Sequence, residues 1–268
     1  MKIILLFILA ITITSCSDDN NTIENQPPIT SYYFANMHYS QTALPSSTES
    51  NKVTLEYNSS GQIIKRLGGV RGVDPSAAFG GIYASEVSDD IFYSDHSILV
   101  EEGRILPWYT NPVSRTKILL DNNNRVIERI NIKESLASQN WLDTLKFTYN
   151  SLGLISETKL GKPNNSGYEF SKYYYNSEKN LDSIITIQVI NSNLYNKIKE
   201  TFGSYDNARN PIKNLFLFKE TFLRSLSQNN YMYYEKNKYD FDNNLVYHEE
   251  RNWTIPHDAN GEILFDLN

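Results

Sequence analysis

Hydrophobic and polar residues alternate along much of this chain. The alternation is clearest in three segments, namely Val53–Tyr57, Leu145–Tyr149 and the series Leu181, Ser183, Ile185, Ile187 and Val189. A period of two turns one row of side chains towards a core and the other towards water, as in antiparallel β-strands. By the same pattern, Leu245, Tyr247 and Trp253 are predicted on the core side of the last strand.

Short polar segments separate the alternating stretches. Each contains Asn, Asp or Gly, which tolerate the left-handed backbone conformation of tight turns, and Asx side chains can bond the backbone two residues on. The seven segments are 57–61, 121–124, 149–153, 175–180, 205–210, 241–244 and 257–261. They predict a sheet built from consecutive hairpins.

Two stretches break the alternation. Gly68 to Gly81 is rich in glycine and is predicted to be a long loop. Pro211 to Ser227 carries apolar residues near helical spacing, with a proline at its start and asparagines after its end, so we expect one short amphipathic helix there.

These patterns together predict an all-β fold. Residues 32–268 are expected to form a single domain, an antiparallel meander of consecutive hairpins. Because a long sheet twists and must cover its apolar face, it should make a long curled sheet or a barrel-like structure, with one short helix.

The unit of strand, Tyr-Asp/Asn turn and strand resembles the YD or RHS-like repeat. The segment Tyr205-Asp206-Asn207-Ala208-Arg209-Asn210-Pro211 is the most specific, and it is similar to a feature of repeat-containing lipoproteins of Bacteroidota. The resemblance covers about residues 50 to 268, and several units lack the Tyr, the Asp or the Gly. Large RHS proteins enclose a toxin in many repeats; this chain has too few for that role to be carried over.

The N-terminal residues have the pattern of an export signal. Lys2 precedes the apolar stretch Ile3–Ile13, which is too short for a membrane-spanning helix, and Ile13-Thr14-Ser15-Cys16 resembles the lipobox of bacterial lipoproteins. The resemblance implies a signal peptide at 1–15 and lipidation of Cys16. The alternative is an ordinary secretory signal with an incidental cysteine.

Residues 16–31 are predicted to form a lipidated, flexible tether. Its first residues, Ser17, Asp18 and Asp19, are similar to the signal that sends Bacteroidota lipoproteins to the outer face of the outer membrane. The resemblance implies a surface-exposed outer-membrane protein held by its lipid, although these residues could simply keep the tether hydrated.

Composition excludes several classes of function. A net charge of −6 gives no basic footprint for nucleic acid. The single cysteine and the four dispersed histidines (His38, His96, His248 and His257) give no reason to expect a metal site. The sequence also lacks a phosphate-binding motif, so we expect no cofactor. The pairs Asp89-Asp90 and Glu101-Glu102 could serve glycoside hydrolysis only if the fold made them face each other. We therefore expect no enzymatic activity.

Aromatic residues are the remaining candidates for binding. Trp108, Tyr109 and Trp253 could offer stacking faces to a sugar or peptide, although aromatic residues are also ordinary core residues of strands. Thr144 and Ser183 lie in Asp-Ser/Thr-apolar triplets that resemble Bacteroidota O-glycosylation sites, which requires both to face solvent.

The sequence thus predicts a non-enzymatic surface lipoprotein that binds a glycan or protein ligand or acts as a scaffold. A glycan-binding or glycan-degrading accessory protein of the cell envelope is the alternative, and a purely structural envelope component is a third. A concave pocket with two facing acids would favour the enzyme.

Overall fold

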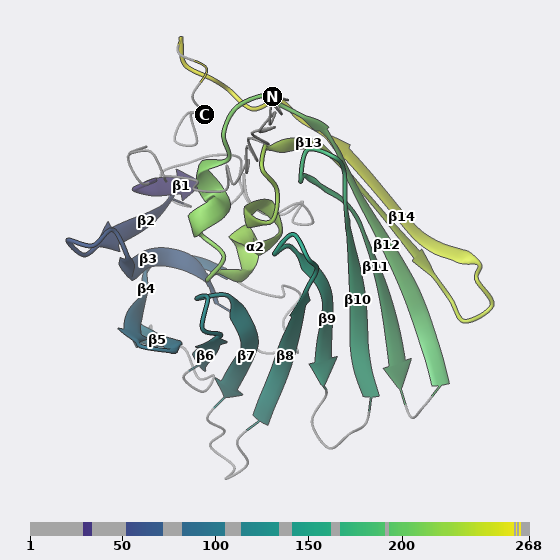
Figure 1. The fold of residues 1–268 in the computed structure, drawn as a ribbon, viewed down its shortest axis with the longest axis horizontal. Coiled ribbons are helices and arrows are strands. Elements are labelled where there is room, and N and C mark those ends of the chain that lie inside the picture. Colours follow the sequence, from purple (N-terminus) through teal and green to yellow (C-terminus); the bar gives the residue numbers. More distant parts are fainter. Residues whose placement is uncertain are drawn as a thin grey trace, which may run out of the picture.

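The computed structural model describes residues 29–33, 52–71, 82–104, 114–133, 141–161, 167–190, 193–259, 261 and 263. Fourteen strands within these ranges form one sheet, in which every strand pairs antiparallel with its neighbours in sequence (Figure 1). β1 and β14 lie at the two ends of this order. The predicted antiparallel meander is confirmed.

The strands vary from three to thirteen residues. They are β1 (Ser31–Tyr33), β2 (Lys52–Tyr57), β3 (Ile63–Arg71), β4 (Ile82–Ser94), β5 (Ser97–Arg104), β6 (Ser114–Leu120), β7 (Val126–Lys133), β8 (Trp141–Tyr149), β9 (Ile155–Gly161), β10 (Gly167–Tyr175), β11 (Leu181–Ile190), β12 (Asn193–Tyr205), β13 (Tyr231–Tyr239) and β14 (Leu245–Asn252).

Five hairpin turns share one construction. An Asn or Asp follows the strand directly, and its side-chain oxygen accepts backbone N–H groups further along the turn; Asn150 Oδ1, for example, accepts those of Leu152 and Leu154, both at 3.0 Å. The residue three positions after this Asx has a positive φ. These residues are Gly61, Asn124, Gly153, Lys179 and Asn243. The predicted left-handed turn chemistry is therefore present, even where the residue is not glycine.

Tyrosines at the ends of strands add a second recurring contact. The hydroxyl of Tyr149, the last residue of β8, donates to the carbonyl oxygen of Val126, the first residue of β7, at 2.7 Å. Tyr205 donates in the same way to the carbonyl oxygen of Leu181, and Tyr57 to that of Ile29. The Tyr-Asx sequence thus combines a bond to an earlier part of the chain with a turn signal.

The start of the sheet lies slightly earlier than predicted. The backbone N–H of Leu55 bonds the carbonyl oxygen of Thr30, and Ser31 is already paired with Thr54. The last residues of the predicted tether therefore belong to the sheet edge.

The predicted glycine-rich loop is wrong over its first four residues. Gly68 to Arg71 belong to β3, and Gly68 sits at a register shift with φ +83°. A Cβ there would come within 2.8 Å of the carbonyl oxygen of Lys52, so glycine lets the strand continue through a bulge. Residues 72–81 lie outside the described ranges.

The predicted short helix is present as the α-helix α2 (Lys219–Ser225), and the first part of the predicted stretch forms a 3₁₀-helix, η3 (Pro211–Asn214). Together with their flanks they form what we call the insertion, residues 206–230, between β12 and β13. Its entry is the Tyr205–Pro211 segment, which therefore does not make a tight reversal as predicted. Asn210 caps η3 by accepting the N–H of Ile212 and donates to the carbonyl oxygens of Arg224 and Ser227, which fixes both ends of the insertion to each other.

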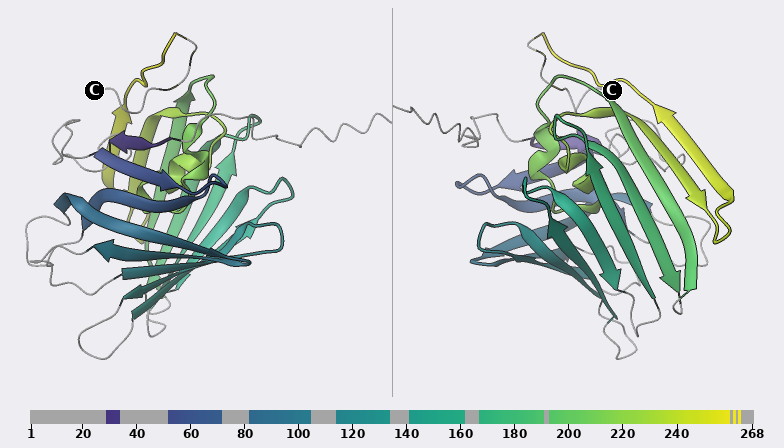
Figure 2. Two further views of the ribbon diagram at one scale, coloured as in Figure 1. Left: turned by 90° about the vertical axis from the view of Figure 1, so that its left-hand side faces the viewer. Right: turned by 45° about the vertical axis from the view of Figure 1, so that its right-hand side comes forward.

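The sheet curls around this insertion, which lies on the concave side (Figures 1 and 2). Its residues Ile212, Leu215, Leu217 and Phe218 share one apolar cluster with core residues of the strands from β1 to β9. A second cluster, built on Leu181, Ile184, Phe202, Tyr231 and Tyr234, lies between the C-terminal strands. The insertion thus supplies the cover that the apolar face of the sheet requires.

Two predicted strand faces are corrected. On β11 a register shift opposite Tyr174 and Tyr175 makes Leu181 and Ile184 the buried pair, so that Ile185, Ile187 and Val189 lie on the other face and are half-buried. On β14, Leu245 and Tyr247 are 54% and 47% exposed instead of buried. On β11 the bulge changes the parity of the strand, which alternation alone does not reveal. On β14, Val246 is exposed as well, so both faces of the strand are open to solvent at this end.

Candidate ligand-binding pocket

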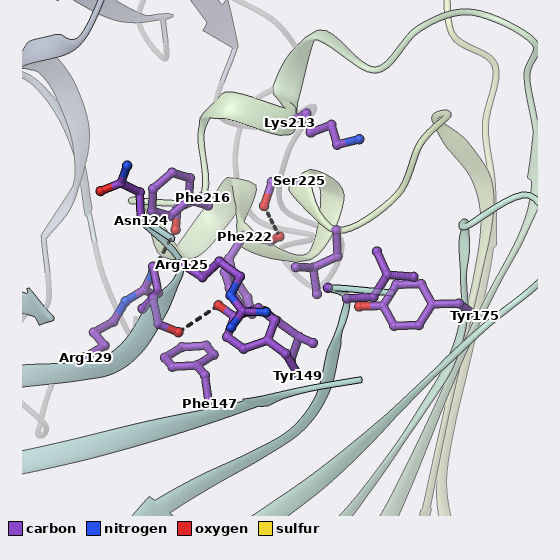
Figure 3. A pocket seen from close by; sticks show the side chains of 15 residues that line it. Asn124, Arg125, Arg129, Phe147, Tyr149, Tyr175, Lys213, Phe216, Phe222 and Ser225 are labelled. Carbon is purple, nitrogen blue, oxygen red and sulfur yellow. Dashed lines mark hydrogen bonds between the residues drawn. The ribbon is translucent and has the colours of Figure 1, made fainter. Parts of the chain in front are cut away.

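A pocket of about 280 Å³ lies between the insertion and the hairpins β6–β7 and β8–β9 (Figure 3). Phe147 and Tyr149 of β8 line it from the sheet, and Phe216 and Phe222 line it from the insertion. The rings of Phe147 and Phe222 meet edge to face, with centroids 5.9 Å apart. The pocket therefore has apolar, largely aromatic walls, which is typical of sites for small organic molecules.

The turns that border the pocket are held rigidly. Leu154 and Gly153 lie in the β8–β9 turn, whose backbone is bonded by the side chain of Asn150. On the β6–β7 side, Asp121 accepts the backbone N–H of Arg125 and also pairs with its guanidinium, with Nη2 and Oδ2 2.7 Å apart. The guanidinium of Arg125 in turn lies over the ring of Tyr149 at 4.7 Å. Side-chain bonds within the protein thus hold both turns at the border of the pocket.

Arg129 of β7 is the most unusual residue of the lining. It is 8% exposed and makes no ion pair with a carboxylate in the described part of the chain. Its Nη2 donates to the carbonyl oxygen of Phe216 at 2.6 Å, its guanidinium lies 5.2 Å from the centroid of Phe222, and its buried Nε has no hydrogen-bond partner among the described residues (Figure 3). Burial lowers the pKa of Arg129 to about 10.

The polar lining is one-sided in charge. Arg125, Arg129 and Lys213 contribute cations, and the described lining residues include no aspartate or glutamate. Burial, and the nearby charges of Lys179 and Arg209, lower the pKa of Lys213, whose Nζ donates to the side-chain oxygen of Gln228 at 2.8 Å. A protein with a net charge of −6 therefore places a local excess of positive charge around an apolar pocket.

The predicted aromatic sites lie elsewhere. Trp253 follows β14 and is half-buried, with its ring 5.8 Å from that of Tyr231 and 5.4 Å from the guanidinium of Arg224. It packs on the second core cluster and does not line the pocket. Trp108 and Tyr109 lie outside the described residues, so the proposed stacking face stays a prediction.

The candidate modification sites differ from each other. Ser183 is 9% exposed and donates to the carboxylate of Asp182, so it fails the condition of facing solvent. Ser183 lies in an inner strand of the sheet, between Tyr174 of β10 and Thr201 of β12, so that neighbouring strands flank it on both sides. Thr144 on β8 is half-buried. Cys16, Ser17, Asp18 and Asp19 lie outside the described residues, as does His38.

The two acidic pairs do come together, because Asp89 lies opposite Glu102 and Asp90 opposite Glu101 in neighbouring strands. Each acid is nevertheless occupied: Asp89 pairs with Arg66, Asp90 with Lys65, Glu101 with Arg115, and Glu102 accepts the backbone N–H of Ser114. None of them lines the pocket. The arrangement is that of an ion-pair network between strands.

The histidines that the structure describes also lie apart from the pocket. His248 contacts Asn237, Glu235 and Glu250 on β13 and β14, and His257 lies 3.1 Å from a carboxylate oxygen of Asp206. Within the described ranges, no three His, Cys, Asp or Glu side chains gather where they could hold a metal ion. Nor has any helical segment described here the length and apolar character needed to cross a membrane.

Sequence reasoning misses the pocket-lining residues Arg129, Phe147 and Arg125 as site residues. Phe147 follows the alternation and is expected only in the core. Arg129 carries a misleading signal, since Ile130 and Ile132 beside it suggest that their own face is the inner one; both are half-buried on the outer side. Only the pairing of Arg129 with Ile118 and Leu145 shows that it points inward.

Comparisons with known proteins identify no relative by sequence, since neither family models nor curated proteins give a match. Among solved structures, the chain is similar to a porin-like protein from Bacteroides uniformis, with 12% identity, a TM-score of 0.49 and coverage of 79% of this chain and 80% of that one. A porin-like protein from Bacteroides vulgatus gives 11% identity, a TM-score of 0.49 and coverage of 82% and 87%.

Proposed function

We propose that this protein is a non-enzymatic binding protein of the cell envelope that takes up a small, largely apolar molecule in the pocket beneath the insertion. The observation that carries the proposal is the pocket itself: five aromatic rings, contributed by the sheet and by the insertion, line a space of about 280 Å³. Apolar walls with few polar groups are the usual form of a small-molecule site.

The pocket favours binding over catalysis. Asp89 and Glu101, which belong to the two acidic pairs, are held in ion pairs away from the pocket. The hydroxyl of Ser225 in the lining already donates to the carbonyl oxygen of Phe222 at 2.6 Å. A glycan-binding role is the alternative. A sugar needs several free neutral hydrogen-bonding side chains around it, and in this lining the hydroxyls of Tyr149 and Ser225 already donate to backbone carbonyl oxygens.

The binding proposal is tested with phenylnaphthylamine, an uncharged dye that fluoresces in apolar surroundings. Titration of the purified protein should show saturable binding. Leu154→Trp should weaken it at least about tenfold, because the larger side chain at this half-buried position occupies the pocket.

Leu152→Trp is the matched control for this titration. Leu152 lies in the same turn but is 67% exposed and lines no part of the pocket, so binding should stay at the wild-type value. Equal effects of the two variants, or no saturable binding by the wild type, would contradict the proposal. Competition by simple sugars, with no dye displaced by apolar molecules, would support the glycan alternative.

We propose further that the chain is anchored in the outer membrane through lipid on Cys16, with Ser17-Asp18-Asp19 directing it to the cell surface. The support is the sequence pattern from Lys2 to Asp19. Cys16→Ala should abolish incorporation of a labelled fatty acid. Replacing Asp18 and Asp19 by Ala should protect the protein from protease added to intact cells, whereas the wild type should be digested.

A further inference from the structure

We infer that the ligand of this pocket is an amphipathic anion, an apolar body bearing one carboxylate- or sulfonate-type head group, and that Arg129 is the residue that selects it. This inference rests on the proposed function of the pocket. Its basis is an arginine that is only 8% exposed, lines the cavity and lacks a carboxylate partner in the described residues.

A buried cation without a counter-ion is costly. Taking a charge out of water is offset only by an opposite charge or by hydrogen bonds to most of its donors. Arg129 has one such bond, from Nη2 to the carbonyl oxygen of Phe216, and its buried Nε has no partner among the described residues. The ring of Phe222 at 5.2 Å gives a weaker cation–π contact. An anion in the pocket would supply the missing negative charge.

The groups around Arg129 do not supply that anion. Glu220 is the carboxylate whose charge acts on Arg129, but its oxygen Oε1 already accepts hydrogen bonds from Arg66 and from the hydroxyl of Tyr32. Tyr173, the other group that acts on Arg129, keeps its proton because burial raises the pKa of Tyr173 to about 12. At neutral pH the guanidinium therefore keeps its charge for a ligand.

The rest of the lining agrees with this polarity. Lys213 adds a second cation to the lining, whereas Arg125 is already paired with Asp121. Phe147, Tyr149 and Phe222 remain for the apolar body of the ligand. Arginine is suited to this task, since its planar fork binds oxyanions with directed, charge-assisted hydrogen bonds. The ligand is consequently expected to combine a ring or chain with one terminal oxyanion.

The test compares two dyes with the same ring system. Phenylnaphthylamine is uncharged, and anilinonaphthalene sulfonate adds one anionic group. The wild-type protein should bind the sulfonate about tenfold more tightly than the uncharged dye, as one charge-assisted pair provides. Arg129→Met should reduce the ratio of the two affinities to about one, because it removes the charge that only the sulfonate engages. Arg129→Lys should keep part of the preference, because it restores the charge without the fork.

Arg115→Met is the control for charge in general. Arg115 lies outside the pocket on β6 and pairs with Glu101 at 2.6 Å, and its removal changes the net charge by the same amount. It should leave the ratio of the two affinities unchanged.

The outcomes separate the two proposals. Binding of both dyes with equal affinity, or an equal loss for both in Arg129→Met, would overturn the role of Arg129 and leave the binding pocket standing. Failure of the wild type to bind either dye would overturn the binding function itself. A merely structural role for Arg129 would change both affinities together, so the ratio distinguishes it from recognition.

Discussion

Two buried arginines lie beneath the same insertion, and only one of them is paired with carboxylates. Arg66 of β3 is held by the carboxylates of Asp89 and Glu220, with the ring of Phe218 at 4.5 Å. Arg129 of β7 has a carbonyl oxygen and a ring instead. The two residues are 9% and 8% exposed, so burial alone does not explain the difference.

The pKa shifts express the same contrast. Burial alone would lower the pKa of Arg66, but Glu220 and Asp89 raise it above the ordinary value. Burial lowers the pKa of Arg129 to about 10, because no comparable carboxylate opposes it. The charge of Arg66 is thus balanced by carboxylates within the protein, and this ion-pair network stabilises the fold. The charge of Arg129 is not balanced in this way, and it lies beside a cavity.

Among the substitutions that test this contrast, Arg66→Met should have the largest effect on stability. It leaves the carboxylates of Asp89 and Glu220 buried without their cation, so we expect the free energy of unfolding to fall by about 3–5 kcal/mol. Urea denaturation monitored by circular dichroism measures this. Lys65→Met, which removes a neighbouring cation with a 36% exposed side chain, should cost less than about 1 kcal/mol. Equal losses would mean that the Arg66 network contributes nothing special.

Alkaline pH probes a tyrosine in each region. Burial, and then the Glu220 carboxylate, raise the pKa of Tyr32 well above its ordinary value, and burial raises that of Tyr173 to about 12. Because the folded pKa exceeds the unfolded one, this stability is present below about pH 10 and is lost as the pH rises towards 12. By pH 11 the contribution of Tyr173 should have fallen by about 1–1.5 kcal/mol relative to pH 9.

Tyr173→Phe should remove that part of the decline, as measured by urea denaturation at pH 9 and 11, and Tyr32→Phe should do so for its own region. Tyr174→Phe, whose side chain is 44% exposed, should keep the wild-type slope. If all three variants decline like the wild type, the buried hydroxyls do not govern the alkaline limit.

The smallest expected effect on the free energy of unfolding is that of Arg129→Met. Arg129→Met replaces an uncompensated buried charge by an apolar side chain, so the free energy of unfolding without ligand should change by less than about 1 kcal/mol. The same urea experiment measures it beside Arg66→Met. A loss near 3 kcal/mol would show that the bond to the carbonyl oxygen of Phe216 stabilises the insertion, and the contrast between the two arginines would disappear.

Local chemistry makes most of the fold predictable. The Asx residues at 58, 121, 150, 176 and 240 each bond their own turn, so the signal for a reversal is contained in four or five adjacent residues. Such signals do not depend on the rest of the molecule, and five hairpins can be predicted from them. The same logic fails at Tyr205-Asp206, because the path of the chain beyond these residues is decided by the packing of the insertion on the sheet.

The candidate pocket is not predictable in the same way. Its walls come from β7, β8 and the insertion, and only the curl of the sheet brings Phe147 and Phe222 together. Arg129, the residue proposed to select the ligand, lies in a strand whose isoleucines favour the opposite face. Bulges change which side chains point inward, and they arise from pairing between strands, which no window of adjacent residues contains.

The insertion joins two strands that remain neighbours, since Tyr205 still pairs with Tyr231 on either side of residues 206–230. One continuous stretch of sequence therefore provides the roof of the pocket, while the floor belongs to the sheet. Substitutions at Phe216 or Phe222 therefore change the side chains that face the pocket without touching the hydrogen-bonded pairing of any strand.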